Sequence, residues 1–142
     1  MDQLGKIFEE AFKNNLRNRG MAIENHQQVI LLGDLNFRIN TMTRQEVMDR
    51  IRKGDINNLL DQDNLVVTFD QMSKTKKCLE NKYQDMLFKQ FQEGVITFMP
   101  TYKYDLRSNE YDTSKKQRVP AFCDRIMWKR NPSIQQLYYN NV

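Results

Sequence analysis

Apolar residues near the start of the chain recur at spacings of three and four. This spacing places them on one face of an α-helix, because each turn takes 3.6 residues. The pattern predicts an amphipathic helix of about four turns that packs one face against a core. Its apolar positions are Leu4, Ile7, Phe8, Ala11, Phe12 and Leu16. The polar residues 20–28 that follow predict a loop.

The next apolar stretch is short and uninterrupted. Val29–Leu32 are four consecutive apolar residues, and Gly33 follows them. A run of this length without alternation is typical of a strand buried on both faces. Polar side chains then occupy every second position, at Asp34, Asn36 and Arg38. If the strand continued, its alternation would direct all three to one face.

Capping residues mark two short helices. Thr43 and Glu46 have the spacing of a capping box, in which each side chain accepts a hydrogen bond from the other residue's backbone N–H. The helix predicted over residues 44–53 stops at Gly54, which suits the left-handed conformation of a helix end. Asp55 can cap a second short helix through its side-chain oxygen. The apolar residues of that helix are Ile56, Leu59 and Leu60.

The second half of the chain begins with a polar region. Residues 61–82 carry three closely spaced lysines and predict a polar, mobile insertion. A helix over 79–91, stopped by Gly94, and a strand over Val95–Met99 are predicted next. Turn-forming residues at 108–114 then separate two segments rich in aromatic and β-branched residues. These flanks predict a hairpin-like pair of strands or strand-like loops.

This order of elements is mixed α/β. A strand buried on both faces requires covering layers on both sides of its sheet. Only three or four strands are predicted, which is few for a sheet covered on both sides. The sequence shows no repeat and no second domain. We therefore expect the chain to be part of a larger α/β domain.

The composition is that of a folded protein. With 142 residues, 39% of them apolar, the chain can bury a core. Its longest apolar runs have four residues, too short to span a membrane, and its first residues do not resemble a signal peptide. Cys78 and Cys123 are far apart and are predicted to be free thiols in the cytosol. One histidine and two cysteines argue against a structural zinc site.

The net charge of +4 is concentrated in one segment. Residues 101–130 hold eight of the 22 basic residues and four of the 18 acidic residues, which leaves fourteen of each elsewhere. A local excess of positive charge suggests an anionic partner, such as phosphate groups, nucleic acid or an acidic membrane face. The alternative is an ordinary solvated face with several lysines.

The segment Gly33-Asp34-Leu35-Asn36-Phe37-Arg38 carries candidate chemistry. A carboxylate at Asp34 could orient or deprotonate a water molecule. An amide at Asn36 could form a hydrogen bond with a substrate oxygen or with that water. The alternative is a simple exit from a strand, because Asp and Asn are common turn formers.

A second candidate lies in the basic segment. Tyr102 and Lys103 would lie near Lys116 and Arg118 if the two flanks pair, and lysine and arginine together bind phosphate well. The alternative is an exposed strand edge protected by lysine. Asp124 is surrounded in sequence by apolar residues, where a carboxylate needs a partner. Its neighbour Arg125 could supply a simple ion pair.

Three motifs, taken together and in this order, resemble the inositol polyphosphate 5-phosphatase family, within the metal-dependent phosphoesterases that include the DNase I-like nucleases. The motifs are GDLNFR, FQEGVITFMPTYKYD and RVPAFCDRIMW. The first is shared widely in the larger group, whereas the other two are more specific to the 5-phosphatases. The similarity runs from Val29 to Trp128, interrupted by residues 61–82. It implies a four-layer α/β sandwich, of which this chain would supply the C-terminal half.

The resemblance also implies roles for individual residues. Asp34 would position and activate the attacking water, and Asn36 would contact that water or the scissile phosphate. Asp124 would hold the orientation of a catalytic histidine. The residues implied to bind the neighbouring ring phosphate are Tyr102, Lys103, Lys116 and Arg118. The reaction implied is hydrolysis of a 5-phosphate with Mg2+ as cofactor, by a cytoplasmic protein that acts peripherally at a membrane surface.

Departures from the family pattern leave two alternatives open. Phe37 and Phe122 replace other aromatic residues of the family. The family's metal-binding glutamate and catalytic histidine have no counterpart here, and His26 is expected to be a surface residue of a polar loop. The chain alone is therefore expected to have weak or no activity. A phosphoinositide-binding module without catalysis, or a DNase I-like nuclease, are the alternatives.

Overall fold

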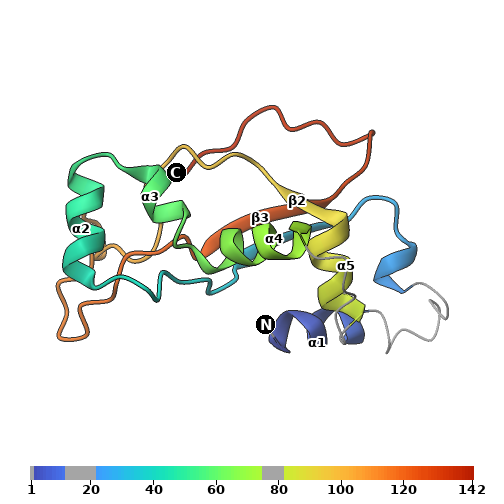
Figure 1. Ribbon diagram of the computed structural model, residues 1–142, viewed down its shortest axis with the longest axis horizontal. Helices are drawn as coiled ribbons and strands as arrows, with labels where there is room; N and C mark the ends of the chain where they lie inside the picture. The colour runs from blue at the N-terminus through green and yellow to red at the C-terminus, as the bar shows by residue number, and fades with distance from the viewer. Residues whose placement is uncertain (1, 12–21, 75–81) are drawn as a thin grey trace.

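The computed structural model describes residues 2–11, 22–74 and 82–142. The strands run through the middle of the molecule, with helices α4, α5 and α1 along one side and α2 and α3 toward one end (Figure 1). The elements are, in chain order, α1 (Asp2–Glu10), the 3-10 helix η2 (Ile23–Asn25), β1 (Ile30–Asp34), α2 (Arg44–Arg52), α3 (Ile56–Leu60), α4 (Asn64–Lys74), α5 (Lys82–Gln90), β2 (Phe91–Glu93) and β3 (Asp124–Lys129).

The three strands form an antiparallel sheet in the order β1-β3-β2. Ile30 of β1 pairs with Trp128 of β3, and Asp34 pairs with Asp124. β2 pairs along the other edge of β3. The central strand is therefore β3, and its first residue lies beside the last residue of β1.

The prediction that β1 is buried on both faces is wrong. Leu31 packs against the core, whereas Ile30 and Leu32 are 60% and 67% exposed. Ile126, which pairs with Leu32, is 41% exposed. Helices α1, α4 and α5 all contribute side chains to the core on the Leu31 side. The apolar run is real, but only one of its two faces is covered by helices of this chain.

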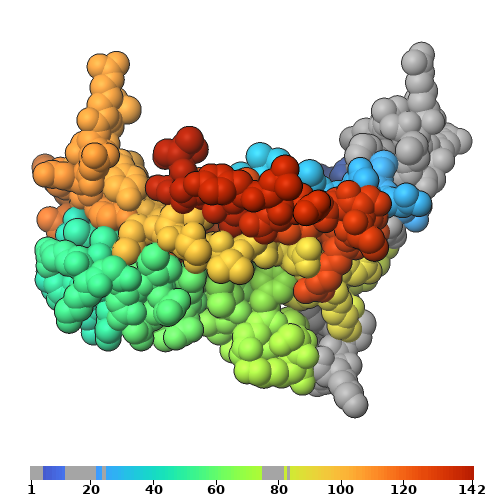
Figure 2. Space-filling view, turned by 90° about the horizontal axis from the view of Figure 1, so that it is seen from above, coloured from blue at the N-terminus to red at the C-terminus, as the bar shows by residue number. Residues whose placement is uncertain are grey.

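The C-terminal segment lies over the other face of the sheet. It runs back across the molecule toward the loops around residues 101–120, as the red segment in Figure 2 shows. Ile134 lines a small apolar hollow together with Ile30, Ile126 and Trp128. Residues 130–142 form no regular helix or strand.

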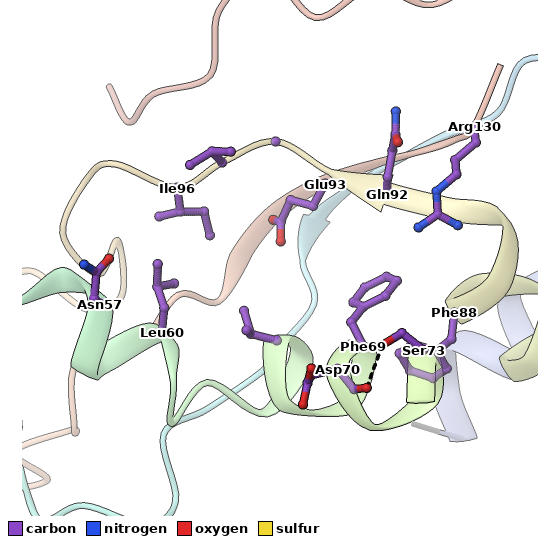
Figure 3. A pocket seen from close by; sticks show the side chains of 13 residues that line it. Asn57, Leu60, Phe69, Asp70, Ser73, Phe88, Gln92, Glu93, Ile96 and Arg130 are labelled. Atoms are coloured by element: carbon purple, nitrogen blue, oxygen red, sulfur yellow. Dashed lines mark hydrogen bonds between the residues drawn. The ribbon is translucent and has the colours of Figure 1, made fainter. Parts of the chain in front are cut away.

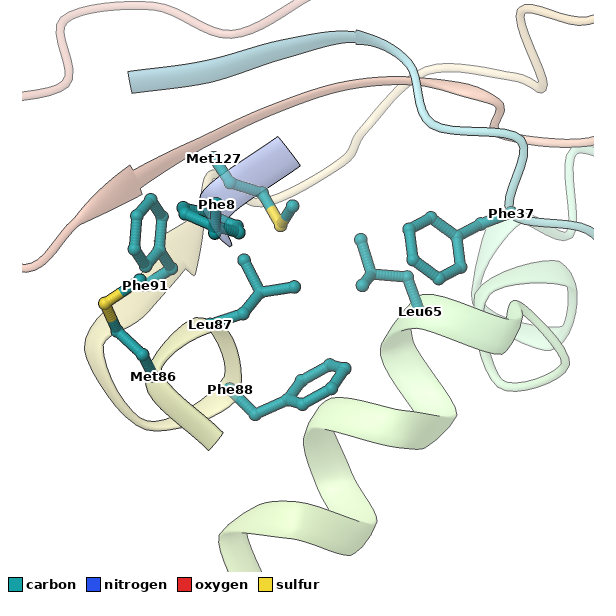
Figure 4. Close-up of a cluster of buried hydrophobic side chains, with 8 residues drawn as sticks. All are labelled: Phe8, Phe37, Leu65, Met86, Leu87, Phe88, Phe91 and Met127. Carbon is teal, nitrogen blue, oxygen red and sulfur yellow. The ribbon is translucent and has the colours of Figure 1, made fainter. Parts of the chain in front are cut away.

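The larger core lies between the sheet and helices α1, α4 and α5 (Figure 4). Its ring contacts are edge-to-face, with centroids 5.6 Å apart for Phe8 and Phe91 and 5.1 Å apart for Phe69 and Phe88. This is a favoured arrangement for aromatic pairs. The buried members of this core are Phe8, Phe37, Leu65, Met86, Leu87, Phe88, Phe91 and Met127.

The amphipathic N-terminal helix is present as α1. Phe8 is 3% exposed, as its predicted place on the apolar face requires. Ile7, predicted on the same face, is 52% exposed. The helix ends at Glu10, and the predicted apolar positions beyond Ala11 lie outside the described residues.

Helices α2 and α3 confirm the capping predictions. The Thr43 side chain accepts from the backbone N–H of Glu46, and the Glu46 carboxylate accepts from the backbone N–H of Thr43. Gly54 has a φ of +68°, and the Asp55 side chain accepts from the backbone N–H of Asn58. The second core forms around these helices and contains Ile39, Val47, Leu59, Ile96, Phe98 and Phe122.

Within the polar insertion predicted over residues 61–82, residues 64–74 form the helix α4. Asp63 begins this helix, because its carboxylate accepts from the backbone N–H of Val66 at 3.1 Å. Leu65 is fully buried, and Phe69 and Met72 pack against the same core. Their four- and three-residue spacing outweighs the polar composition. Residues 75–81 lie outside the described part of the chain.

The predicted strand over Val95–Met99 is displaced along the chain. Helix α5 ends at Gln90, and the strand β2 begins at Phe91, before Gly94 rather than after it. Residues 95–99 form no ladder, although Ile96 and Phe98 are buried and Val95 is exposed. The sequence pattern reflects the alternation of buried and exposed side chains. Such alternation does not require that the segment pairs with another strand.

A buried ion network ties the sheet to the start of α4. Arg125 donates to Asp63 Oδ1 at 2.8 Å and to both carboxylate oxygens of Glu93 at 2.7 and 2.6 Å. The Arg125 and Asp63 side chains are fully buried. Tyr139 of the C-terminal segment donates to Glu93 at 2.9 Å. Four segments distant in sequence therefore meet in one network of hydrogen bonds and ion pairs.

In the part of the chain that the structure describes, no helix has the length and apolar character needed to cross a bilayer.

Candidate active site

Two carboxylates meet at one end of the β1–β3 ladder. Asp34 is the last residue of β1 and Asp124 is the first residue of β3, and the register places them directly opposite each other. Opposed residues of an antiparallel pair point to the same face, where like charges destabilise the sheet. Both residues are exposed. A pairing that costs the sheet stability indicates a functional role.

The Asp124 carboxylate accepts a hydrogen bond from Thr101 Oγ1 at 2.8 Å. The apolar setting expected for Asp124, and the ion pair with Arg125, are both wrong. Successive residues of a strand point to opposite faces. Asp124 is therefore exposed, whereas Arg125 is buried and binds Asp63 and Glu93.

Asn36 does not continue the strand. Its φ is +56°, in the left-handed region, and its backbone N–H donates to Asp34 Oδ1 at 2.9 Å. This is the local turn that an aspartate side chain forms with the residue two positions on. The predicted strand alternation through residue 38 is therefore wrong, and the turn-former alternative describes the backbone. The turn itself keeps Asp34 and Asn36 together.

Arg38 lies between Asn36 and Tyr102. Its Nε and Nη2 atoms donate to Asn36 Oδ1 at 2.8 and 2.6 Å. Its Cζ atom lies 4.0 Å from the centre of the Tyr102 ring. Tyr102 is held in turn by two backbone hydrogen bonds with Ala121, at 3.0 and 2.9 Å. Arg38 is absent from the residues predicted to form the site, and its place in the alternating pattern was the only signal for it.

Two hollows open beside the carboxylates. One, of about 400 Å³, is lined by Asp34, Asn36 and Arg38 together with residues of α1 and α4. The other, of about 410 Å³, is lined by Asp124, Thr101 and the C-terminal residues 140–142. The structure thus brings Asp34, Asn36 and Asp124 to one end of the sheet, between two surface depressions.

A larger hollow lies elsewhere. It measures about 570 Å³ and is bounded by α3, α4 and residues 92–96, with Phe69, Phe88 and Glu93 in its walls (Figure 3). None of the site residues predicted from sequence is among the residues that line it. The candidate catalytic residues therefore place the site at the end of the β1–β3 ladder, not in this larger hollow.

Asp112 organises the loop that carries the basic residues. Its carboxylate accepts from the backbone N–H groups of Ser114, at 3.1 Å, and Arg118, at 2.9 Å, and its own N–H donates to the carbonyl of Lys103. Hydrogen bonds from Ser114 and Arg118 lower the pKa of Asp112 from 3.8 to about 2. The backbones of Lys103 and Arg118 are thereby joined through the buried residue Asp112, which uses its own N–H toward Lys103 and its carboxylate toward Arg118.

The basic side chains themselves face solvent. Lys103, Lys116 and Arg118 are exposed, and Tyr102 beside them is half-buried. The sequence predicted that these residues would approach one another if the flanks paired. The Tyr102–Ala121 bridge and the Asp112 contacts join the backbones of the two flanks, whereas the approach of the basic side chains stays a prediction. Sequence reasoning missed Asp112, which holds this loop in place. The signal for it was its spacing from Ser114, which is that of an Asx-turn.

A tyrosine pair supports the base of this loop. The rings of Tyr104 and Tyr111 stack with centroids 4.3 Å apart, and their hydroxyls lie 2.8 Å apart. Tyr111 also donates to the carbonyl of Pro100 at 2.8 Å. Burial, together with the contact to Tyr104, raises the pKa of Tyr111. Tyr111 is therefore a structural hydrogen-bond donor.

Cys123 is not a nucleophile of this site. It is fully buried, and its thiol donates to the carbonyl of Phe37 at 3.4 Å. Burial raises the pKa of the Cys123 thiol to about 12. Nucleophilic chemistry requires the thiolate. His26 is distant as well, since it precedes β1 at the end opposite to Asp34.

The described residues contain no group of three or more His, Cys, Asp or Glu side chains that could hold a metal ion. Asp34 and Asp124 are two acids with Asn36 nearby, which is fewer than the roughly six to eight oxygen ligands that Ca2+ takes. These residues therefore do not form a complete metal site by themselves.

Comparisons with known proteins identify relatives of the chain. It matches the endonuclease/exonuclease/phosphatase family 2 over residues 2–142. A Schizosaccharomyces pombe protein described as a probable inositol polyphosphate 5-phosphatase is 42% identical over 113 residues, which cover 80% of this chain and 8% of that protein. The mouse type II inositol 1,4,5-trisphosphate 5-phosphatase is 36% identical over 121 residues, which cover 85% of this chain and 11% of that protein.

A solved structure extends the comparison to the fold. The inositol polyphosphate 5-phosphatase domain of a synaptojanin, crystallised with inositol (1,4)-bisphosphate and a calcium ion, matches with a TM-score of 0.62 and 38% identity. The match covers 79% of this chain and 29% of the domain. It confirms the predicted fold class, part of a DNase I-like α/β domain. The chain spans about a tenth of the length of the curated relatives and under a third of the solved domain.

Proposed function

The chain belongs to the endonuclease/exonuclease/phosphatase family, and from this premise we propose that it carries part of the active site of an inositol polyphosphate 5-phosphatase. Its relatives include a 5-phosphatase of inositol 1,4,5-trisphosphate and a domain that binds inositol (1,4)-bisphosphate. The second compound is what remains of the first when its 5-phosphate is removed. The compounds named for these two relatives are therefore the substrate and the product of one 5-phosphatase reaction.

The observation that carries the proposal is the opposition of Asp34 and Asp124 beside the basic loop. Phosphate monoester hydrolysis depends on an aligned water and on neutralisation of the phosphate charge. Exposed carboxylates can orient the water and accept its proton. Lys103, Lys116 and Arg118 are exposed in the basic loop and would supply the positive charge for that neutralisation.

In the proposed reaction, water attacks phosphorus, the bond from phosphorus to the ring oxygen breaks, and that oxygen leaves as a hydroxyl group with a proton from solvent. Asp34 orients the water and receives its proton. Asn36 contacts the scissile phosphate through its amide. Asp124, steadied by Thr101, orients a histidine that this chain does not provide.

The second half of the site holds the substrate. Lys103, Lys116 and Arg118, with the hydroxyl of Tyr102, bind the ring phosphate next to the one removed. Arginine offers paired N–H donors to phosphate oxygens, and lysine adds compact positive charge. These contacts fix the ring so that the 5-phosphate faces Asp34.

A divalent cation is part of the proposal, with Mg2+ as the expected ion. Bound at such a site, it would neutralise the phosphate charge. Since the described residues do not complete a metal site, the ion would depend on ligands from outside them. No step above is assigned to it.

The proposed setting is the cytoplasm, with the protein acting peripherally on phosphoinositides at a membrane surface or on soluble inositol phosphates. The second candidate function is recognition of the same headgroup without turnover. The incomplete metal site of the described residues favours this alternative for the chain taken alone.

Calorimetric titration of the chain with inositol (1,4)-bisphosphate tests recognition. The variant Lys103→Ala/Lys116→Ala should abolish binding, because it removes two of the three cationic side chains. The matched control Lys6→Ala/Lys53→Ala removes two exposed lysines elsewhere and should bind like the wild type. Equal affinities for both double variants would contradict the proposed phosphate site.

A further inference from the structure

Arg38 makes an unusual pair of contacts. Two of its N–H groups converge on one amide oxygen, Asn36 Oδ1, at 2.8 and 2.6 Å. Its guanidinium carbon Cζ lies over the Tyr102 ring, 4.0 Å from the ring centre. We propose that Arg38 is a positioning residue that fixes the amide of Asn36 and aligns it with Tyr102. This inference rests on the proposed function, in which Asn36 and Tyr102 contact different phosphates of one substrate.

The first consequence concerns which way the Asn36 amide points. An arginine side chain only donates hydrogen bonds, so the group that faces Arg38 must be the amide oxygen. The NH2 group of Asn36 is then directed away from Arg38 and offers two N–H donors. A phosphate oxygen accepts such donors, whereas a reversed amide would present its own oxygen and repel the phosphate.

The backbone of Asn36 is fixed independently. Its N–H donates to Asp34 Oδ1 at 2.9 Å, and its φ is +56°. With the backbone held by Asp34 and the side-chain oxygen held by Arg38, the orientation of the amide is fully determined. The same residue that orients water in the proposed reaction therefore also anchors the amide beside it.

Tyr102 provides a rigid support for Arg38. Its backbone exchanges hydrogen bonds with Ala121 at 3.0 and 2.9 Å, next to β3. A guanidinium stacks on an aromatic ring through its planar face. Tyr102 thus fixes the position of Arg38, and Arg38 fixes that of Asn36. In this way Asn36 is held relative to the segment that carries the ring-phosphate contacts.

Arg38 also retains an uncompensated charge. Among the described residues, no carboxylate lies within ion-pair distance of it; its polar contacts are the Asn36 oxygen and the Tyr102 ring. It lines the same hollow as Asp34 and Asn36. A buried structural arginine in this molecule behaves differently, since Arg125 is bound by two carboxylates. The charge of Arg38 is therefore available to an anion in the hollow.

Two substitutions separate positioning from charge. Arg38→Lys keeps the charge but has neither the planar fork nor a flat face for Tyr102. Arg38→Met removes the charge as well. Arg52→Lys is the matched control, because Arg52 is exposed and pairs with Asp49 on the surface of α2. The midpoint of urea unfolding identifies any variant that has lost its fold. If Arg38→Met does not fold, Arg38→Lys alone tests the inference.

The readout is the pair of side-chain amide NMR signals of Asn36 in the full chain, with and without inositol (1,4)-bisphosphate. Both Arg38 variants should shift these signals and speed their hydrogen exchange at least fivefold, and Arg38→Lys should weaken binding of the probe at least fivefold. Arg52→Lys should change neither. Unchanged Asn36 signals in Arg38→Lys would overturn the inference. If the wild type does not bind the probe, the proposed function fails, and the Asn36 signals still decide the role of Arg38.

Discussion

Replacing Arg125 by methionine should destabilise the protein strongly. Methionine fills much of the volume but removes every N–H group that Asp63 and Glu93 accept from. Burial alone would lower the pKa of Arg125, but the contacts with Glu93 and Asp63 outweigh it and raise the pKa. The complete ion network therefore stabilises the charge of Arg125. Without this cation, the carboxylates of Asp63 and Glu93 would destabilise the folded protein.

The size of the effect follows from burial. The Arg125 and Asp63 side chains are 0% exposed, and the Glu93 side chain is 11% exposed. Removing one partner of a buried pair costs about 3–5 kcal/mol, because the remaining charge is left without compensation. With a urea dependence of about 2 kcal/mol per molar, the midpoint should fall by about 2 M. Such a loss is a large part of the roughly 5–15 kcal/mol that stabilises a domain.

Urea unfolding followed by far-UV circular dichroism measures this change. Arg52→Met is the control, because its pair with Asp49 is exposed, with side chains 63% and 47% accessible. An exposed pair contributes about 0–1 kcal/mol. The double variant Asp63→Asn/Arg125→Met should be less destabilised than Arg125→Met, since it leaves one fewer buried charge. An Arg125→Met protein within about 1 kcal/mol of the wild type would refute the reasoning.

Three further predictions test local features. Thr43→Ala should lower the free energy of unfolding by about 1 kcal/mol in chemical denaturation, since it removes the cap of α2, and a change below about 0.3 kcal/mol would speak against the cap. Because the pKa of Asp112 falls from 3.8 to about 2 on folding, its contribution is complete above pH 4 and lost as pH falls toward 2; Asp112→Asn should therefore flatten the stability profile in that range, and a parallel profile would contradict this. In a Cys78→Ser background, Cys123 should react with a thiol reagent at pH 8 only on unfolding, because burial raises its pKa to about 12; rapid reaction of the folded protein would be inconsistent with that burial.

The parts of the fold that the sequence predicted well are set by neighbouring residues. The Thr43–Glu46 capping box and the Asp55 cap act over three positions, so they read the same way in the sequence and in the structure. The motifs predicted the family for a similar reason. Each motif is a continuous stretch of residues, so it can be recognised without knowledge of the fold.

Features that depend on distant partners could not be predicted. Whether both faces of β1 are covered depends on elements elsewhere in the domain, and here Leu32 is exposed. The contact of Arg38 with Tyr102 joins residues 64 positions apart in sequence. Asp63 looked like one more acid of a polar stretch, and only the fold shows it buried against Arg125. Composition described residues 61–82 poorly because a few apolar side chains at helical spacing decide the structure of residues 64–74.

The most direct test of the central claim is turnover. Residues 29–128 of this chain can replace their equivalents in the related synaptojanin domain, and phosphate release from inositol 1,4,5-trisphosphate can be measured. If these residues form part of a 5-phosphatase site, the chimeric domain should yield inositol (1,4)-bisphosphate, and Asp34→Asn should lower the rate at least a hundredfold. A correctly folded chimera that binds the product but releases no phosphate would contradict the claim and identify the chain as a recognition module.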